Sequence, residues 1–429
     1  SQFYAQSVCS PTRVSLMTGQ NSARHRVTQF ISPESKNAGP KDWKWEGLNS
    51  KDITLPSILR TNGYHTIFAG KAHFAPIGHE GEDPTKLGFD INIAGCSFGA
   101  PGSYFGEDGY GNLNPKRKKR AVPGLEKYHN TDTFLSEAIT LEAKDAVTRS
   151  IQKGKPFFLY MSHYAVHSPF QSDPRFIKNY ENSKKPRSAK SFATLIEGID
   201  KSLGDLMDHV ADRGVAENTL ILFVGDNGSD APLGDTYGYF SSAPLRGKKG
   251  TCYEGGMRVP FIASWAKAGK TNPFNIARNH LHHEQIGTVM DIYSTIVDAT
   301  NSSSPPNHPV DGVSLLSQLS GKINKERPDH FMCHFPHSHR SSYFTSFRKG
   351  DWKLIYRYLT NGGKRKSKDP LPKYELYNLK NDPYETQNLA LGNSSKTNEM
   401  IRLMSKQLEA EKALLPVKDG GELKPTPIQ

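Results

Sequence analysis

The sequence predicts an α/β protein, built as an α/β/α sandwich around a mixed, mostly parallel sheet, with a smaller C-terminal α+β subdomain. Continuous apolar runs, typical of strands buried on both faces, alternate with segments of helical periodicity over most of the chain. From about residue 327 the pattern changes to short alternating strands followed by one helix. The chain has 429 residues, enough for two such units, and we expect them to span residues 1–326 and 327–429.

The first predicted helix opens the run Cys9-Ser-Pro-Thr-Arg-Val-Ser-Leu-Met-Thr-Gly. Pro11 suits the first turn of a helix, and Gly19 suits the left-handed position just past the helix end. Cys9 is therefore expected at a helix N-terminus, where free N–H groups and the helix dipole favour an anion. Arg13 lies one turn further along and can face the same spot.

The other elements follow from apolar periodicity and from glycine or proline stops. Residues 74–130 are rich in glycine, proline and charge, and we expect them to form a long irregular insertion. The elements expected in the larger unit are helices at 52–62, 133–151, 192–213 and 285–299, and strands at 64–69, 156–161, 219–224 and 259–265. Those expected in the smaller unit are strands at 352–358 and 375–379 and a helix at 396–414.

Polar side chains follow two of the predicted parallel strands, at the carboxyl end where open α/β sheets bind ligands. Asp226 and Asn227 offer two adjacent oxygen donors that suit a hard cation, Ca²⁺ or Mg²⁺, although Asn-Gly is also a common turn pair. Lys71 and His73 follow the strand at 64–69. Alone, such a lysine is usually solvent-facing and such a histidine usually structural.

Two further segments carry candidate chemistry. His163 and His167 follow the strand at 156–161, and a histidine can donate a proton near neutral pH. The residues alone do not choose between the two histidines. The glycine-rich basic loop around Lys248 and Lys249 could bind any phosphate-like anion.

The net charge of +12 suggests an acidic partner: nucleic acid, anionic lipid or anionic polysaccharide. Basic runs at 116–120 and 364–366 carry part of this charge, and each could equally be a solvated loop. No apolar run is long enough to span a membrane. Four cysteines are too few for a disulfide scaffold; if Cys9 is catalytic, the others allow at most one internal bridge.

The run from Cys9 to Gly19 resembles the signature of the type I, formylglycine-dependent sulfatases of the alkaline phosphatase superfamily. Residues 245–260 resemble the family's Leu-Arg-Gly-x-Lys-Gly-x-x-x-Glu-Gly-Gly-x-Arg-x-Pro, and residues 381–390 resemble its C-terminal Asp-Pro-x-Glu-x-x-Asn-Leu signature. The resemblance covers essentially the whole chain from Cys9 onward. It implies a sulfuric ester hydrolase.

The resemblance also implies a role for each candidate. Cys9 would be oxidised to formylglycine, whose hydrate is the nucleophile and also a metal ligand. His73 would hold the hydrate or the sulfate. The family's His-x-Pro after the strand at 156–161 matches His167 and not His163, so His167 would protonate the leaving oxygen and His163 is expected to be structural. The cations that would stabilise the transferring group are Arg13, Lys71, Lys249 and a Ca²⁺ (Mg²⁺ possible), and the metal ligands would be Cys9, Asp226 and Asn227.

The implied partners are a sulfated carbohydrate substrate and a formylglycine-generating or sulfatase-maturing enzyme, with no nucleic acid. The implied compartment is periplasmic, secreted or lysosomal. Residues 74–130 and 334–337 are expected to set specificity. Family members begin with a core strand that ends in Asp-Asp, and this sequence contains no Asp-Asp pair, so we expect that strand to be missing before Ser1.

Two other functions stay open at this point. A phosphomonoester or phosphonate hydrolase of the same superfamily would use similar basic groups, because phosphate and sulfate are isosteric. A non-catalytic glycan-binding fragment is the alternative from a different class, since the expected aspartates are not in this sequence.

Overall fold

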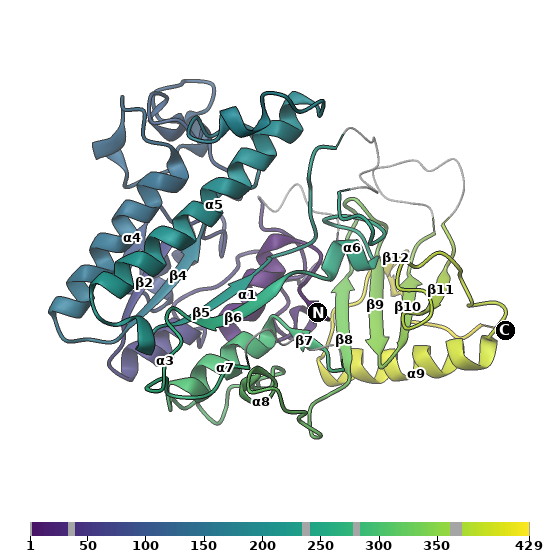
Figure 1. Ribbon diagram of the computed structural model, residues 1–429. Coiled ribbons are helices and arrows are strands. Elements are labelled where there is room, and N and C mark those ends of the chain that lie inside the picture. Colours follow the sequence, from purple (N-terminus) through teal and green to yellow (C-terminus); the bar gives the residue numbers. More distant parts are fainter. Residues whose placement is uncertain (1, 33–38, 234–240, 278–283, 361–370, 429) are drawn as a thin grey trace.

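The computed structural model describes residues 2–32, 39–233, 241–277, 284–360 and 371–428 (Figure 1). Its strands are β1 (Phe3–Tyr4), β2 (His65–Gly70), β3 (Ile91–Ile93), β4 (Phe157–Ser162), β5 (Leu220–Val224), β6 (Phe261–Trp265), β7 (Gly287–Thr288), β8 (His330–Phe335), β9 (Phe344–Lys349), β10 (Trp352–Arg357), β11 (Tyr374–Asn378), β12 (Val417–Lys418) and β13 (Gly421–Glu422). Its α-helices are α1 (Cys9–Thr18), α2 (Ser22–His25), α3 (Leu55–Thr61), α4 (Leu135–Gln152), α5 (Arg187–Asp212), α6 (Glu254–Met257), α7 (Met290–Ala299), α8 (Leu316–Leu319) and α9 (Ser394–Ala410).

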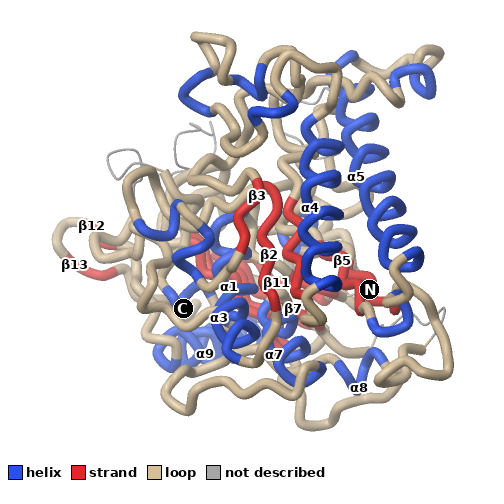
Figure 2. The backbone as a smooth tube through the Cα atoms, turned by 90° about the vertical axis from the view of Figure 1, so that its left-hand side faces the viewer, coloured by secondary structure: helices blue, strands red, loops and turns tan. Residues whose placement is uncertain are grey.

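A parallel sheet of β3, β2 and β4 lies between two helical layers, which confirms the predicted fold class. Successive side chains of a strand point to opposite faces, and β2 shows this clearly. Ile67 and Ala69 pack in the same core as α4, whereas Phe68 packs in the same core as Val14 and Met17 of α1. Figure 2 shows α4 and α5 side by side, with α1, α3 and α7 on the other side of the strands.

The strand before Asp226 is predicted from the sequence to be parallel to its neighbour. It is antiparallel in the structure. β5 pairs antiparallel with β6, from Leu220 opposite Trp265 to Val224 opposite Phe261. A parallel pair needs a crossover, usually a helix, and the described part of this connection contains only the four-residue α6. Among the described residues, β5 and β6 therefore form an antiparallel pair separate from the parallel sheet of β3, β2 and β4.

The predicted strands at 156–161 and 219–224 are half-buried rather than buried on both faces. Among the described residues, β4 pairs only with β2 and β5 pairs only with β6. Each strand therefore keeps one unpaired edge, and Phe223 of β5 is 36% exposed.

The segment at 74–130 is more ordered than predicted. It contains β3, which extends the parallel sheet, and short 3₁₀ turns. Its fully buried aromatic side chains Phe74, Phe89, Tyr104 and Tyr110 pack into the cores on the two faces of that sheet. A three-residue strand is too short to show a period, so β3 could not be predicted from the sequence pattern.

The C-terminal unit is a four-stranded antiparallel sheet in the order β11-β10-β9-β8, with α9 along one face (Figure 1). Met332, Phe347 and Leu354 pack in one core with Met404 of α9. The opposite face of the sheet joins the core of the larger unit, where the rings of Tyr4 and Phe331 stack 5.1 Å apart. The two units therefore share a hydrophobic core.

All four cysteines are buried and free. Within the described ranges, no helix combines the length and the apolar character needed to cross a bilayer.

A buried carboxyl follows the last turn of α9. Glu411 is 3% exposed, its Oε1 accepts a 2.7 Å hydrogen bond from Gln407, and its Oε2 has no hydrogen-bond partner among the described residues. Burial and the nearby charge of Asp311 raise the pKa of Glu411 to about 8. A carboxyl of this kind keeps its proton in the folded protein after the unfolded chain has released it. Its contribution to stability is therefore full below the ordinary pKa near 4.3 and is lost as the pH rises toward 8.

Glu411→Gln is expected to raise the free energy of unfolding by roughly 2–4 kcal/mol at pH 7.5 and to leave it nearly unchanged near pH 4. Glutamine keeps the shape of the side chain but has no proton to release. Denaturant unfolding at both pH values measures the effect. Glu409→Gln, at an exposed position of the same helix, is the control. An equal effect of Glu411→Gln at both pH values would contradict this account.

Candidate active site

Helix α1 places Cys9 at its first position, as the sequence predicts. Every residue of α1 is buried, and the helix ends at Gly19, whose φ of 69° is left-handed. The N-cap residue Val8 offers no side-chain hydrogen bond to the free N–H groups at the helix start. Those groups and the helix dipole therefore favour negative charge near Cys9.

The Cys9 thiol is 3% exposed and lies 3.4 Å from Nδ1 of His73. Burial alone would raise the pKa of the thiol. The charges of Lys71, His73 and Lys249 outweigh burial and hold the pKa of Cys9 well below its usual value. The side chain at this position therefore lies in a strongly positive environment.

Lys71 and His73 follow the end of β2 and are fixed through their backbones. The Lys71 N–H donates to Ser162 at 2.6 Å and the His73 N–H donates to Cys96 at 3.0 Å. Nε2 of His73 donates to the Ile31 carbonyl at 2.8 Å, so Nδ1 is the atom that faces Cys9. Lys71 is 3% exposed, and burial is the main cause that lowers its pKa to about 8.

Arg13 does not simply face the same spot as Cys9. Its guanidinium donates to Oδ2 of Asp226 at 2.9 and 3.2 Å, to the Lys71 carbonyl at 2.7 Å and to the Ser162 hydroxyl. Arg13 therefore ties α1 to the ends of β2, β4 and β5. Its main effect on the site is to hold these elements together.

Asp226 and Asn227 lie where β5 ends. Burial opposes ionisation of Asp226, but the charges of Arg13, Lys71 and Lys249 keep its pKa far below the usual range, so it is a carboxylate. Oδ1 of Asn227 is buried without a hydrogen-bond partner among the described residues, while its Nδ2 donates to the Gly228 carbonyl. An orphaned amide oxygen beside a carboxylate fits a hard cation.

The described residues supply only part of such a cation site. No group of three or more His, Cys, Asp or Glu side chains in the described ranges could hold a metal ion. Ca²⁺ takes six to eight oxygen ligands, so Asp226 and Asn227 fit as two members of a larger set.

His167 belongs to the same cluster. Its Nδ1 donates to the Ser168 carbonyl at 3.0 Å, which leaves Nε2 as the free ring nitrogen. Burial, followed by the charges of Lys71 and Lys249, lowers the pKa of His167 to about 4. His163 instead contacts the Ser202 hydroxyl of α5 at 2.9 Å, as expected of a structural histidine.

Lys249 lies on a loop that two backbone hydrogen bonds hold in place. Its N–H donates to the Ser229 carbonyl at 3.1 Å, and the next residue, Gly250, donates to the Ser7 carbonyl at 2.7 Å. Among the described residues, neither the Lys249 nor the Lys71 ammonium has a hydrogen-bond partner, although both act on Cys9, Asp226 and His167. Two ammonium groups that act on Cys9 and that have no partner within the described ranges suit an anionic ligand.

The sequence interpretation missed three residues of this region: Ser162, which bonds Arg13, and the ion pair between Asp230 and Arg340. Asp230 lies only four residues after Asp226, so its place near the predicted site could have been inferred from the sequence. Arg340 gave no sequence signal, because its partner lies 110 positions away.

The expectation that residues 334–337 set specificity does not hold for the two histidines. His334 is buried and bonds Thr345 and the Leu414 carbonyl, while His337 is buried against Thr28. A histidine-rich segment looks functional in sequence, but these two rings fill the core. Of the basic runs, 116–120 is mostly exposed. The run at 364–366 lies outside the described residues.

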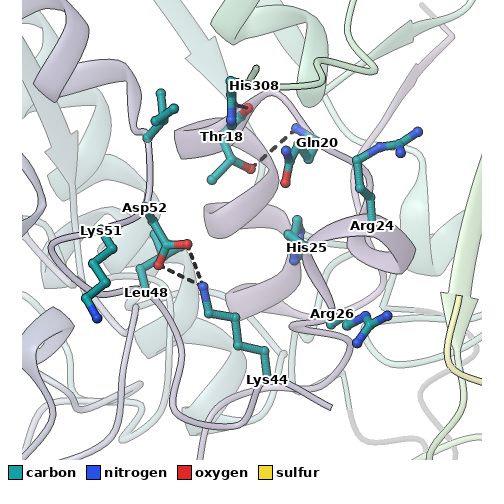
Figure 3. Close-up of a pocket in the computed structure, with 11 residues that line it drawn as sticks. Thr18, Gln20, Arg24, His25, Arg26, Lys44, Leu48, Lys51, Asp52 and His308 are labelled. Atoms are coloured by element: carbon teal, nitrogen blue, oxygen red, sulfur yellow. Dashed lines mark hydrogen bonds and ion pairs between the residues drawn. The ribbon is translucent and has the colours of Figure 1, made fainter. Parts of the chain in front are cut away.

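A cavity of about 370 Å³ lies at the opposite end of α1, next to Thr18 (Figure 3). Four lysine or arginine side chains line it, but Lys44 pairs with Asp52 at 2.6 Å and Arg24 pairs with Asp311 at 2.7 Å. None of the residues predicted to act on substrate lines this cavity. It is therefore separate from the site around Cys9.

Comparison with known proteins finds matches to two family models, which together cover most of the chain. Residues 1–302 match the family model described as Sulfatase. Residues 247–413 match the model described as N-sulphoglucosamine sulphohydrolase, C-terminal.

Individual proteins agree with the family models. The chain is 28% identical to N-acetylgalactosamine-6-sulfatase of Canis lupus familiaris over 76% of this chain and 60% of that protein. It is 26% identical to a sulfatase of Formosa agariphila over 95% of this chain and 79% of that protein. This chain thus spans about 60% of the length of the first of these relatives.

Among solved structures, the fold matches Ps i-CgsB in complex with k-i-k-neocarrahexaose with a TM-score of 0.71. The identity is 22%, and the match covers 95% of this chain and 84% of the other. This likeness shows a common fold.

Proposed function

We propose, from the premise that this chain belongs to the sulfatase family of the alkaline phosphatase superfamily, that the protein hydrolyses sulfate esters of a saccharide. One observation carries the proposal. A buried cysteine at a helix start is under the electrostatic influence of two ammonium groups, Lys71 and Lys249, that have no hydrogen-bond partner in the described part of the chain. Such an arrangement suits an anionic group that is bound by both lysines next to a nucleophile.

Cys9 is proposed to be converted to formylglycine by a formylglycine-generating or sulfatase-maturing enzyme. The hydrated aldehyde would supply one hydroxyl that attacks sulfur and displaces the alcohol, and a second whose deprotonation would release sulfate and restore the aldehyde. His73 lies 3.4 Å from the Cys9 sulfur and is proposed to hold the oxygen that replaces it. Because Nε2 of His73 is bound to the Ile31 carbonyl, Nδ1 is free to accept a proton from that oxygen.

Lys71 and Lys249 are proposed to bind the sulfate oxygens. Donors that are already in place where negative charge develops usually make the largest contribution to catalysis. Arg13 keeps the Lys71 carbonyl and Asp226 in position through its own hydrogen bonds, so the two ends of the site stay fixed. No reorganisation is then needed when the sulfate arrives.

His167 is proposed to deliver a proton to the leaving oxygen. In the empty site the two lysines help to lower its pKa to about 4, so it is neutral at pH 7. A bound sulfate would offset the charges of Lys71 and Lys249 and raise the pKa of His167. The free Nε2 is therefore expected to become protonated only when substrate is present.

A calcium ion, or magnesium in its place, is proposed to be held in part by Asp226 and Asn227, with an oxygen at position 9 as a further ligand. The carboxylate of Asp226 and the orphaned Oδ1 of Asn227 support this assignment. The ion would supply Lewis-acid stabilisation of the sulfate charge.

The proposed substrate class is a sulfated polysaccharide or oligosaccharide. The names of the relatives support it, since one is an N-acetylgalactosamine-6-sulfatase and one solved structure holds a neocarrahexaose. The net charge of +12 and the exposed basic run at 116–120 would attract such a polyanion. We also propose that residues 1–326 form the catalytic unit and residues 327–429 the accessory unit.

The test compares 4-nitrophenyl sulfate with 4-nitrophenyl phosphate and a phenyl phosphonate ester, on protein co-expressed with a sulfatase-maturing enzyme. We expect kcat/KM for the sulfate to exceed that for the others by about 100-fold or more. Faster turnover of the phosphate or phosphonate would favour the hydrolase alternative from the same superfamily. Binding of sulfated glycans without turnover of any ester would favour the non-catalytic alternative.

A further inference from the structure

The C-terminal unit reaches into the site through one arginine. Arg340 lies between β8 and β9, and Figure 1 shows β8 rising beside α6 of the larger unit. Its guanidinium donates to Oδ1 and Oδ2 of Asp230 at 2.6 and 2.8 Å and to the Lys249 carbonyl at 3.3 Å. The next residue, Ser341, donates to the Gly250 carbonyl at 3.1 Å. Two loops of the larger unit are thus held by adjacent residues of the smaller one.

The backbone at Gly250 allows this close approach. Its φ of +80° is left-handed, and a Cβ placed there would lie 3.1 Å from Cδ of Arg340. Any other residue would be strained at this φ and would press on the arginine. The loop is therefore shaped to accept Arg340.

Three cations act on the single negative charge of Asp230. Arg340 grips both of its oxygens, and Nζ of Lys248 lies 3.8 Å from Oδ1. Lys249 also acts on Asp230 electrostatically, although no hydrogen bond joins the two. If the arginine were absent, the carboxylate would be free to pair with either lysine.

We propose that Arg340 is a positioning residue that engages both oxygens of Asp230 and so keeps this carboxylate from neutralising Lys249. Arginine suits the task, because its planar fork matches a carboxylate with two parallel hydrogen bonds. The Lys249 ammonium then stays available for the sulfate group of the substrate. This inference rests on the proposed function, in which Lys249 binds sulfate.

A double-mutant cycle tests the inference: wild type, Arg340→Ala, Asp230→Asn and the double variant. The readouts are kcat/KM for 4-nitrophenyl sulfate and the affinity for inorganic sulfate by calorimetry. Arg340→Ala is expected to lower both by about tenfold when Asp230 is present and to change neither appreciably when residue 230 is asparagine. Arg340→Lys, which keeps the charge but not the fork, is expected to recover only part of the loss.

A loss in Asp230→Asn alone as large as that in Arg340→Ala would overturn the proposal, because a purely structural clamp fails when either partner of the ion pair is removed. An equal loss from Arg340→Ala in both backgrounds would also overturn it, because the effect would then not depend on the charge of Asp230. Thermal unfolding of each variant checks the fold. If Arg340→Ala does not fold, Arg340→Lys replaces it in the cycle. Lys349→Ala is the control, since Lys349 pairs with Asp329 in the same unit at 2.6 Å. Sulfate affinity does not require turnover, so the cycle gives an answer even if the proposed hydrolysis fails.

Discussion

Cys9→Ala is expected to abolish sulfate ester hydrolysis, with a fall in kcat of about 10⁴-fold or more, while the fold is kept. The variant lacks the sulfur from which the proposed nucleophile is made. Alanine is smaller than cysteine and occupies a first helical position that needs no side-chain hydrogen bond, so helix α1 should still form. Steady-state turnover of 4-nitrophenyl sulfate, with circular dichroism of the purified variant, measures both effects.

Two further observations sharpen this expectation. Peptide mass spectrometry of the wild-type protein, co-expressed with a maturing enzyme, should show an aldehyde at position 9. Cys96→Ala is the matched control, because the buried free thiol of Cys96 contacts the Tyr164 hydroxyl, and the backbone carbonyl that accepts from His73 is kept in the variant. Turnover that survives in Cys9→Ala would contradict the proposed nucleophile, as would an unmodified thiol in fully active enzyme.

The second large effect is expected on kcat/KM when Lys71 or Lys249 loses its ammonium group. Lys71→Ala and Lys249→Ala are each expected to lower kcat/KM for 4-nitrophenyl sulfate by about 10²–10³-fold. Each change removes a cation from the place where sulfate charge develops. Each should also weaken inhibition by inorganic sulfate, which is measured in the same assay.

Lys248→Ala is the matched control for this pair of variants. Lys248 neighbours Lys249 in sequence, but its ammonium is 3.8 Å from Asp230 and is not among the charges that act on Cys9. We expect at most about a threefold change, because the 3.8 Å interaction between Lys248 and Asp230 is a weak one. A loss in Lys248→Ala as large as that in Lys249→Ala would contradict the assignment of the sulfate-binding lysine.

The pH dependence provides a separate check on Lys71. Because burial lowers the pKa of this lysine to about 8, it is cationic below that pH and neutral above it. In the wild-type enzyme kcat/KM should therefore fall as the pH rises through about 8. The fall should be absent in Lys71→Ala, and its persistence there would assign it to another group.

Local patterns determined the elements and the candidate residues. Pro11 and Gly19 marked the ends of α1, because proline and glycine have fixed conformational roles whatever surrounds them. Apolar periodicity placed α4, α5 and α9 to within a few residues, since a helix must bury one face. The family motifs then selected Cys9 and its neighbours.

Local patterns did not predict the shortest strand, the strands interrupted by polar residues, or the direction of one strand. β3 has three residues, and β8 and β9 are interrupted by charged and polar residues that the tertiary structure buries. The antiparallel direction of β6 depends on how its connection folds back. Neither property leaves a period in the sequence.

What the sequence by itself determined is therefore the fold class, the family resemblance and the residue types at the strand ends. The tertiary structure alone decided how those residues are used. It turned Arg13 toward Asp226, 213 positions away, and it buried His334 in the core. It also brought Arg340 to Asp230 across the two units. Such contacts depend on which surfaces pack together, and the distance between two residues along the chain carries no record of that packing.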